Sequence, residues 1–338
     1  MTVTRPGIEN GSATVQNRTG CDITASGRVT PEGGSLEQAP CPICGLSDEK
    51  FLFFAFDKMF SWRQEKFPVV RCRHCGLVYL NPRPSRQTRN LYYEGYPCRA
   101  DRMDQSQPLA HYQPVIDFLA RRSPGRILDI GTGNSPFLPA MKERGWETFG
   151  TEIDAGLVDY YRSRYGIEIF EGELEDAKLS SESFDAVTIM GVLEHVPYPR
   201  LLLEEAGRIL KPGGVIILWC FNRGAEADLL GRYWLGFDTP RHFYSFSSKT
   251  LGRLLAVSGF EVTDSYYRPI SYLAHSGVWA ARRFRDRVLG REPAAWVPNL
   301  PAFLQKMSLP LGWVLARRES GSNVYLFARK AGRAPAAK

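Results

Sequence analysis

The chain lacks long apolar runs. None of its 338 residues lie in a stretch of ~18 consecutive apolar residues, which a membrane-spanning helix needs, and the first 20 contain no apolar run typical of a secretion signal. We therefore expect a cytoplasmic protein. Hydrophobic residues make up 43% and charged residues 23% of the chain, which excludes fibrous and wholly disordered proteins. At roughly 150 residues per domain, the length predicts one large domain and a small module.

Cysteine is scarce, and its count of seven is odd, which without a secretion signal argues against a disulfide framework. Four of the seven form two similar turns, Cys41-Pro-Ile-Cys44-Gly and Cys72-Arg-His-Cys75-Gly. Two such turns supply four thiolates, the ligand set of a tetrahedral structural zinc. A redox dithiol would need only one pair. The spacing predicts a closed zinc ribbon over residues 40–82, with zinc bound by Cys41, Cys44, Cys72 and Cys75.

The net charge of +7 is distributed unevenly along the chain. Residues 60–126 carry 12 basic and 5 acidic side chains, residues 127–222 carry 8 and 16, and residues 223–338 carry 18 and 8. Two basic flanks around an acidic middle favour an anionic partner, and nucleic acid, a phosphorylated small molecule and an anionic membrane surface all stay open. A surface that is merely soluble and arginine-rich explains the same pattern.

The order of apolar segments predicts the domain organisation. Residues 1–39 have too few large apolar side chains to offset their ordering entropy, so they are expected to be a disordered tail; 331–338 form a second tail. From Arg126, short apolar strands alternate with helical segments, which predicts an α/β domain over 126–330 with a parallel sheet covered on both faces. An insertion is expected around 223–320. Strands are expected at 126–130, 148–152, 168–170, 184–190, 215–220 and 323–329, and helices at 114–122, 136–144, 156–165, 200–210 and 248–258.

The most informative motif is a glycine-rich turn after the first of these strands. Asp129 precedes Gly131 and Gly133, which let a ligand approach the backbone. This is not the dinucleotide fingerprint, because the acid precedes the glycines and the third glycine is absent. Glu152 ends the next strand, where a carboxylate can accept hydrogen bonds from ribose hydroxyls. In chain order there follow GEL at 172–174, FDAVTIM at 184–190, LEHV at 193–196 and LKPGG at 210–214.

This ordered set of motifs resembles the class I S-adenosylmethionine-dependent methyltransferases over residues 126–222 and onward to about 330. The resemblance implies a doubly wound, mostly parallel, seven-stranded Rossmann-like sheet with S-adenosylmethionine as its cofactor. Glu152 would bind both ribose hydroxyls and Glu173 the adenine amino group. The implied cofactor-binding set is Asp129, Gly131, Gly133, Glu152, Glu173, Leu174 and Met190. Residues 83–125 would form a linker and cofactor-capping helices, with Tyr92, Tyr93 and Tyr96 closing over the cofactor or packing in the linker core.

Two subgroups of this class are similar to further parts of the chain. The paired cysteines and residues 76–84 resemble methyltransferases with an N-terminal zinc-binding ribbon, some of which methylate sugars in antibiotic or surface-glycan pathways. The LEHV region resembles the quinone O-methyltransferases, in which an E-x-x-E-H run binds a divalent metal. Gly191 stands at the first acid position of that run here, so this second metal is not expected.

Histidine is the usual supplier of a base near neutral pH, which methyl transfer to a hydroxyl or amine can require. His195 follows the fourth strand, and His242 lies in the insertion among Arg241 and several aromatic residues. Each is predicted to be catalytic or substrate-positioning, against the alternative that it only packs. Because ligands of doubly wound sheets sit beyond the carboxyl ends of the strands, the two should converge. The basic stretch 279–291 is expected to be a solvated helix face with one buried side, with phosphate or bilayer binding as the alternative.

Together these patterns predict methyl transfer to a small polar, possibly anionic acceptor, expected to be a sugar, a nucleotide-linked sugar or a related pathway intermediate. A quinone-type acceptor is one alternative. RNA is another, although no N-P-P-Y-like amine motif follows the fourth strand. The last alternative is a noncatalytic protein that uses zinc for an interaction, against which the intact acids Asp129, Glu152 and Glu173 argue.

Overall fold

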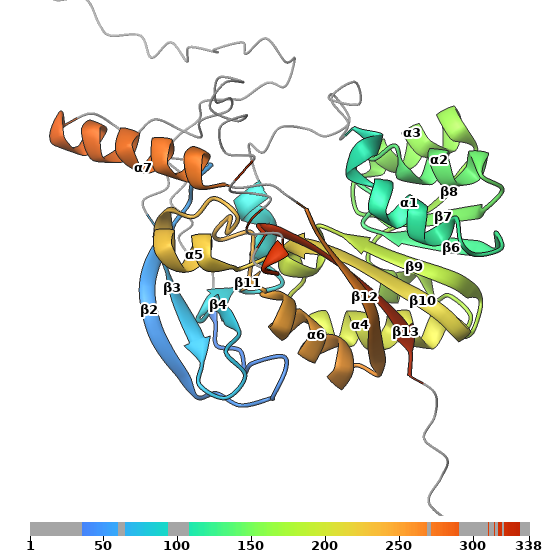
Figure 1. Cartoon of the computed structure of the whole chain (residues 1–338), viewed down its shortest axis with the longest axis horizontal. Coiled ribbons are helices and arrows are strands. Elements are labelled where there is room, and N and C mark those ends of the chain that lie inside the picture. Colours follow the sequence, from blue (N-terminus) through green and yellow to red (C-terminus); the bar gives the residue numbers. More distant parts are fainter. Residues whose placement is uncertain are drawn as a thin grey trace, which may run out of the picture.

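The computed structural model describes residues 36–59, 65–93, 108–268, 272–290, 310, 314, 317–319 and 321–331. Its main feature is a seven-stranded sheet in the order β12-β13-β10-β9-β6-β7-β8 (Figure 1). Neighbours from β10 to β8 are parallel, whereas β13 is antiparallel to both β10 and β12. The expected doubly wound, mostly parallel sheet is confirmed. Its strands are β6 Arg126–Ile130, β7 Glu147–Glu152, β8 Glu168–Glu171, β9 Phe184–Met190, β10 Leu210–Phe221, β12 Phe260–Arg268 and β13 Asn323–Lys330.

Helices cover both faces of this sheet. Side chains of α1, α2 and α3 share one core cluster with it, and side chains of α4 and α6 share the other. Local side chains fix the N-terminal ends of two of these helices. The Asp154 carboxylate caps α3, and Ser247 and Thr250 form a capping box at α6. The helices are α1 Gln113–Leu119, α2 Phe137–Glu143, α3 Ala155–Tyr165, α4 Pro199–Ile209, α5 Ala225–Leu230, α6 Ser248–Val257 and α7 Leu273–Val288, with short 3-10 turns η1 Arg89–Tyr93, η3 Leu109–His111, η4 Leu174–Ala177, η5 Leu193–His195 and η6 Gly231–Tyr233.

The edge strand β12 was not predicted. After Phe260 most of its side chains are exposed, so the sequence shows neither an apolar run nor a clear alternation. Among the described residues, the strand pairs with β13 alone, and its first residue, Phe260, is buried in the core. Backbone pairing of this kind leaves little signal in side-chain composition.

The two cysteine turns flank strands of a second sheet, of order β11-β4-β3-β2, that lies beside the large one (Figure 1). Its strands are β2 Glu49–Phe56, β3 Lys66–Cys72, β4 Val78–Leu80 and β11 Tyr244–Ser245. We call residues 36–84 the cysteine module. The strand β11 comes from the insertion rather than from the module, and it pairs with β4. The module and the insertion therefore share one sheet.

The two cysteine turns have the same backbone geometry. Cys41 N–H donates to Leu46 and Cys72 N–H donates to Leu77, while Gly45 and Gly76 each donate back to the first cysteine of their turn. Both glycines have positive φ, at 72° and 80°, which side chains rarely tolerate. The four sulfur atoms all lie within 4.8 Å of one another. This donor set fits the predicted structural zinc.

The start of the module corrects one expectation. Residues 36–37 were predicted to belong to the disordered tail, but Leu36–Glu37 forms β1 and pairs with β5, Arg83–Pro84. The pairing is fixed by charge, because the buried Arg83 guanidinium donates to the Glu37 carboxylate at 2.8 Å. Residues 1–35 and 332–338, and also Tyr96, lie outside the described residues.

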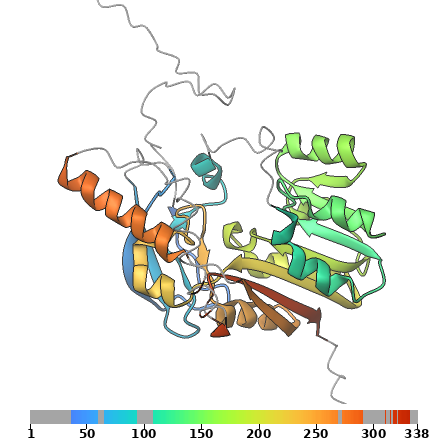
Figure 2. The same cartoon turned by 45° about the horizontal axis from the view of Figure 1, so that its top comes forward.

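The basic stretch near residue 279 falls on α7, which projects beyond the sheet of the cysteine module in both views (Figures 1 and 2). Trp279 is buried and stacks on Phe56, with Arg283 above the Phe56 ring, while Phe284 and Arg285 are exposed. The expected helix with one buried side is confirmed over its described part. Among the described residues, no helix combines the length and apolar character needed to cross a bilayer.

We predict one zinc ion per chain. Replacing one ligand by Cys75→Ser should remove the metal and lower the melting temperature, because structural zinc binding contributes directly to folding. Cys21→Ser, outside both turns, is the matched control and should keep zinc and stability. Metal analysis and thermal unfolding of the three proteins provide the measurement. Zinc-free wild-type protein, or full zinc content in Cys75→Ser, would contradict the assignment.

Candidate functional site

A buried carboxyl group lies in β6, just before the glycine-rich turn. Asp129 is 2% exposed, and its Oδ1 accepts a hydrogen bond from Thr188 Oγ1 of the neighbouring strand at 2.5 Å. Burial, together with the nearby Glu152 charge, raises the pKa of Asp129 to about 7, although the Thr188 bond opposes this shift. A cation placed beside Asp129 would favour its charged form.

Glu152, at the end of β7, organises the same turn. Its Oε2 accepts the Gly133 N–H at 2.7 Å, and its Oε1 accepts those of Ile153 and Asp154 at 2.8 and 3.1 Å. A carboxylate offers about four acceptor sites, so it retains capacity for hydroxyl donors. The structure brings Asp129, Gly133 and Glu152 together as predicted, and the ligand contacts assigned to them stay predictions.

Glu173, after β8, has partners that the sequence did not suggest. Arg86 and Arg89 both donate to its carboxylate. Both arginines precede the large sheet in the chain, so the described start of the 83–125 segment does reach the predicted cofactor site. Leu174, next in the chain, is buried.

Met190 ends β9, and Gly191 follows it. Gly191 has φ of 69°, and a Cβ atom there would lie 2.4 Å from the Trp219 ring. Trp219 pairs with Met190 across the two parallel strands. The glycine that replaces the first acid of the E-x-x-E-H run therefore lets an indole lie against the backbone.

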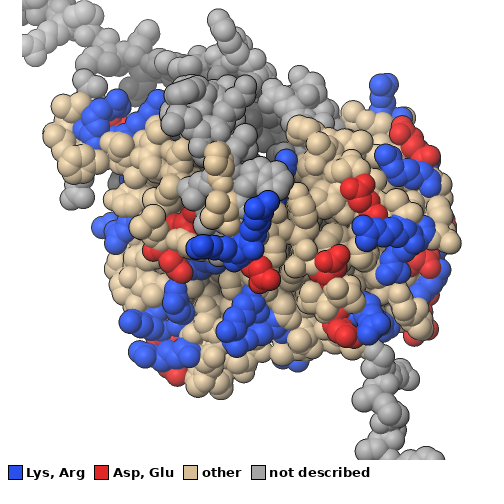
Figure 3. All heavy atoms as spheres, in the orientation of Figure 1, with Lys and Arg blue, Asp and Glu red and all other residues tan. Residues whose placement is uncertain are grey.

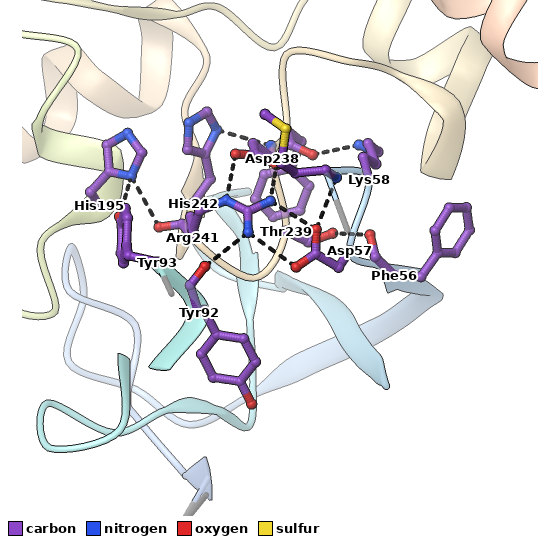
Figure 4. Close-up of polar contacts among 12 residues, drawn as sticks. Phe56, Asp57, Lys58, Tyr92, Tyr93, His195, Asp238, Thr239, Arg241 and His242 are labelled. Atoms are coloured by element: carbon purple, nitrogen blue, oxygen red, sulfur yellow. Dashed lines mark hydrogen bonds and ion pairs between the residues drawn. The ribbon is translucent and has the colours of Figure 1, made fainter. Parts of the chain in front are cut away.

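His195, in η5 directly after β9, is held by two groups. Its Nδ1 lies 3.2 Å from the Arg241 carbonyl oxygen and 3.0 Å from Tyr93 Oη (Figure 4). A carbonyl oxygen only accepts, so the Arg241 bond forms when the proton is on Nδ1. In the neutral ring the lone pair is then on Nε2, which is the arrangement of a base.

His242 lies beside His195, as predicted, with the ring centroids 4.5 Å apart. Its Nδ1 accepts the Asp238 backbone N–H at 3.1 Å, so the neutral ring carries its proton on Nε2. Burial, with the charges of Arg241 and Lys58, lowers the pKa of His242 to about 3. His242 is therefore a neutral hydrogen-bond donor, in contrast to His195.

Glu194 forms a cluster with the two histidines. One carboxylate oxygen of Glu194 and one ring nitrogen of each histidine all lie within 4.8 Å of one another. Glu194 is 2% exposed, and burial raises its pKa to about 7, although the Cys220 thiol and the Phe221 backbone oppose this shift. A divalent metal would need a lone pair from His242, but its Nδ1 is taken by Asp238 and its Nε2 carries the proton. With these tautomers the donor set does not fit a divalent metal.

Arg241 connects this cluster to the rest of the protein (Figure 4). Its guanidinium has five N–H groups. Two donate to Asp57 at 2.9 and 3.0 Å, two to Asp238 at 2.7 and 2.8 Å, and one to the Tyr92 carbonyl at 3.1 Å. Burial alone would lower the pKa of Arg241, but the two carboxylates raise it well above its usual value.

Lys58 adds a second buried cation from the cysteine module. Its ammonium donates to the backbone carbonyls of Trp234 and Phe237, both in the insertion. Burial lowers its pKa to about 7. Neither Lys58 nor Asp57 was predicted as a site residue. Each is a single charged residue without a motif, and its partners lie far away in the sequence.

We predict that Arg241→Lys destabilises the fold by about 3 kcal/mol, because a lysine has three donors and leaves buried carboxylates unpaired. Arg329→Lys is the control, since Arg329 pairs with Glu261 where both side chains are more than half exposed. That change should cost less than about 1 kcal/mol. Denaturant unfolding measures both. Equal effects of the two substitutions would contradict the importance given to Arg241.

Comparisons with known proteins show which family the chain belongs to. Residues 105–265 match the family described as a methyltransferase domain. A ubiquinone biosynthesis O-methyltransferase of Xanthomonas campestris is 32% identical over 246 residues, covering 68% of this chain and 88% of that protein. The Pseudomonas entomophila protein of the same name is 28% identical over 181 residues, covering 48% and 78%.

A solved structure titled as a SAM-dependent methyltransferase from Archaeoglobus fulgidus is 19% identical, with a TM-score of 0.46, and the match covers 71% of this chain and 99% of that one. The identity and coverage of the Xanthomonas protein, together with the matched domain, establish the family. The chain belongs to the S-adenosylmethionine-dependent methyltransferases.

Proposed function

We propose that this protein transfers the methyl group of S-adenosylmethionine to a hydroxyl group of a small, flat acceptor of the quinol type, with His195 as the base. The position of His195 is the observation that carries this proposal. It follows the carboxyl end of β9, and the Arg241 carbonyl favours the tautomer whose lone pair is on Nε2. Ligands of doubly wound sheets bind at this end of the strands.

The cofactor would lie over the turn after β6. Asp129 would face its positive charge, Glu152 would accept from the ribose hydroxyls, and Glu173 would accept from the adenine amino group. The arginine contacts of Glu173 leave further acceptor sites on its carboxylate. Leu174, Met190 and the glycines of the turn would complete the contact surface. S-Adenosylmethionine would supply an electrophilic methyl group bound to a positively charged sulfur. As the acceptor oxygen bonds to the methyl carbon, the carbon–sulfur bond would break and its electron pair would stay on sulfur.

The protein's own part in the reaction is alignment and proton transfer. His195 takes the hydroxyl proton on Nε2 and becomes an imidazolium. Its Nδ1–H then donates to the Arg241 carbonyl, which stabilises that charged ring. His242, neutral and protonated on Nε2, is a positioning group rather than a base. Holding the nucleophile in line with the methyl group contributes the remainder of the rate.

The acceptor class is inferred from the groups around His195. Aromatic rings lie near both histidines. The ring centroids of His242 and Phe221 are 5.5 Å apart, and those of His195 and Tyr93 are 6.5 Å apart. Aromatic side chains favour a flat ring. The names of the Xanthomonas and Pseudomonas relatives specify ubiquinone biosynthesis and O-methylation. A sugar acceptor, expected from the cysteine motif, has no support from these relatives.

The alternatives have weaker support. On the face drawn in Figure 3, lysine and arginine side chains are interspersed with acidic ones, without a continuous basic stripe that would favour RNA. A noncatalytic role is disfavoured by the buried carboxyl groups of Asp129 and Glu152, which the proposed cofactor contacts would use.

We predict that the purified protein methylates a catechol such as 3,4-dihydroxybenzoate in preference to a nucleotide-linked hexose or tRNA. His195→Ala should lower kcat by roughly 10²-fold or more, because the base is lost, while the Kd for S-adenosylmethionine stays nearly unchanged. Radiolabelled methyl transfer and calorimetry provide the two measurements. His74→Ala, a half-exposed histidine of the cysteine module, is the control. Preference for the hexose or tRNA would show that the proposed acceptor class is wrong. Full activity of His195→Ala would show that His195 is not the base.

We also predict that Glu152→Ala weakens S-adenosylmethionine binding by on the order of 2 kcal/mol, or about 30-fold, because a charge-assisted acceptor for two hydroxyls is lost. Glu147→Ala at the exposed start of the same strand should bind normally. Calorimetry on both variants, with melting temperatures to confirm folding, makes the comparison. Unchanged affinity in Glu152→Ala would show that another residue binds the ribose.

A further inference from the structure

We infer that Asp57 of the cysteine module is a positioning residue for methyl transfer: through Arg241, it fixes the carbonyl group that keeps the His195 proton on Nδ1. The inference rests on the proposed function of His195. It assigns to the module a part in the acceptor site in addition to its own folding.

The first step is the ion pair between Asp57 and Arg241. Both side chains are 1% exposed, and both carboxylate oxygens of Asp57 are used, in a bidentate arrangement with Nη1 and Nη2. Such planar pairing is specific to arginine and restricts the guanidinium in both distance and orientation. The Met59 N–H also donates to Asp57 Oδ1 at 2.9 Å, so the carboxylate is fixed to its own strand end.

Residues 238–242 are also anchored to segments outside their own loop. Asp238 lies in the same loop as Arg241, so their ion pair stiffens the loop itself. Among the described residues, its anchors include Asp57, the Tyr92 carbonyl, and the Phe56 carbonyl, which accepts from Thr239 Oγ1 at 2.7 Å. Phe56 ends β2 and Asp57 follows it directly.

The anchored loop also contacts His195. The Arg241 carbonyl lies 3.2 Å from His195 Nδ1, and the Tyr93 hydroxyl lies 3.0 Å from the same atom. The carbonyl can only accept, whereas the hydroxyl can also donate. If the carbonyl moved away, Tyr93 could donate to Nδ1, and the ring proton would shift to Nε2, the nitrogen that must accept the substrate proton.

His195 can therefore adopt either of two tautomers, and we expect Asp57 to favour the one with the proton on Nδ1. Asp57→Asn keeps the shape of the side chain but gives up one acceptor and the negative charge. Arg241 would then lose half of its bidentate contact, and the loop would lose its strongest link to the module. Asp48→Asn is a matched control, because Asp48 is a half-exposed aspartate of the same module that pairs with Arg73 and His74.

The test is nitrogen-15 NMR of histidine-labelled protein, with His195 assigned from His195→Gln. In wild-type protein and Asp48→Asn we expect His195 to be protonated on Nδ1. In Asp57→Asn the proton should move to Nε2, and kcat for the catechol should fall at least about tenfold with KM for S-adenosylmethionine unchanged. Tyr93→Phe in the otherwise wild-type protein leaves the Arg241 carbonyl in place and should keep the proton on Nδ1.

Retention of the Nδ1 proton in folded Asp57→Asn would overturn the inference, as would an equal effect of Asp48→Asn. If Asp57→Asn fails to fold, Thr239→Val weakens the same anchor at Phe56 and carries the same measurement. Absence of methyl transfer by the wild-type protein would overturn the proposed function alone, because the tautomer of His195 is read without any acceptor.

Discussion

The acceptor end of this protein depends on a single requirement, that the buried guanidinium of Arg241 must have a partner for each of its five N–H groups. The cysteine module, the segment before the large sheet and the insertion after β10 each supply some of them. A buried cation that lost one of these carboxylates would be strongly destabilised. The three segments are therefore fixed relative to one another at the place where His195 lies.

Two adjacent histidines acquire opposite properties from this arrangement. The same loop offers a carbonyl to His195 and a backbone N–H to His242, and these groups select different tautomers. Residue type alone does not distinguish a base from a donor at this site. The distinction comes from which backbone group each Nδ1 atom faces, which is set by the conformation of residues 238–242.

Much of the fold was predictable, because local patterns specify it. The strands at Asp129, Glu152 and Met190, and the two cysteine turns, are each encoded within a few residues. The convergence of His195 and His242 followed from strand topology. The contacts between Asp57 and Arg241, 184 residues apart, could not be predicted, because one charged residue does not identify its partner. The same holds for Arg86 and Arg89 at Glu173, and β12 was missed because its edge position removes the apolar pattern.

We infer that the Arg241 contacts, together with a shared apolar cluster, join the cysteine module and the large sheet into one cooperative unit. Hydrogen exchange across a denaturant series measures this directly, with peptides from β3 and β6 followed by mass spectrometry. We predict that the two strands lose protection in the same transition in the wild-type protein, and that in Arg241→Lys β3 opens at a lower denaturant concentration than β6. Separate opening of β3 in the wild-type protein, with β6 still protected, would contradict the account.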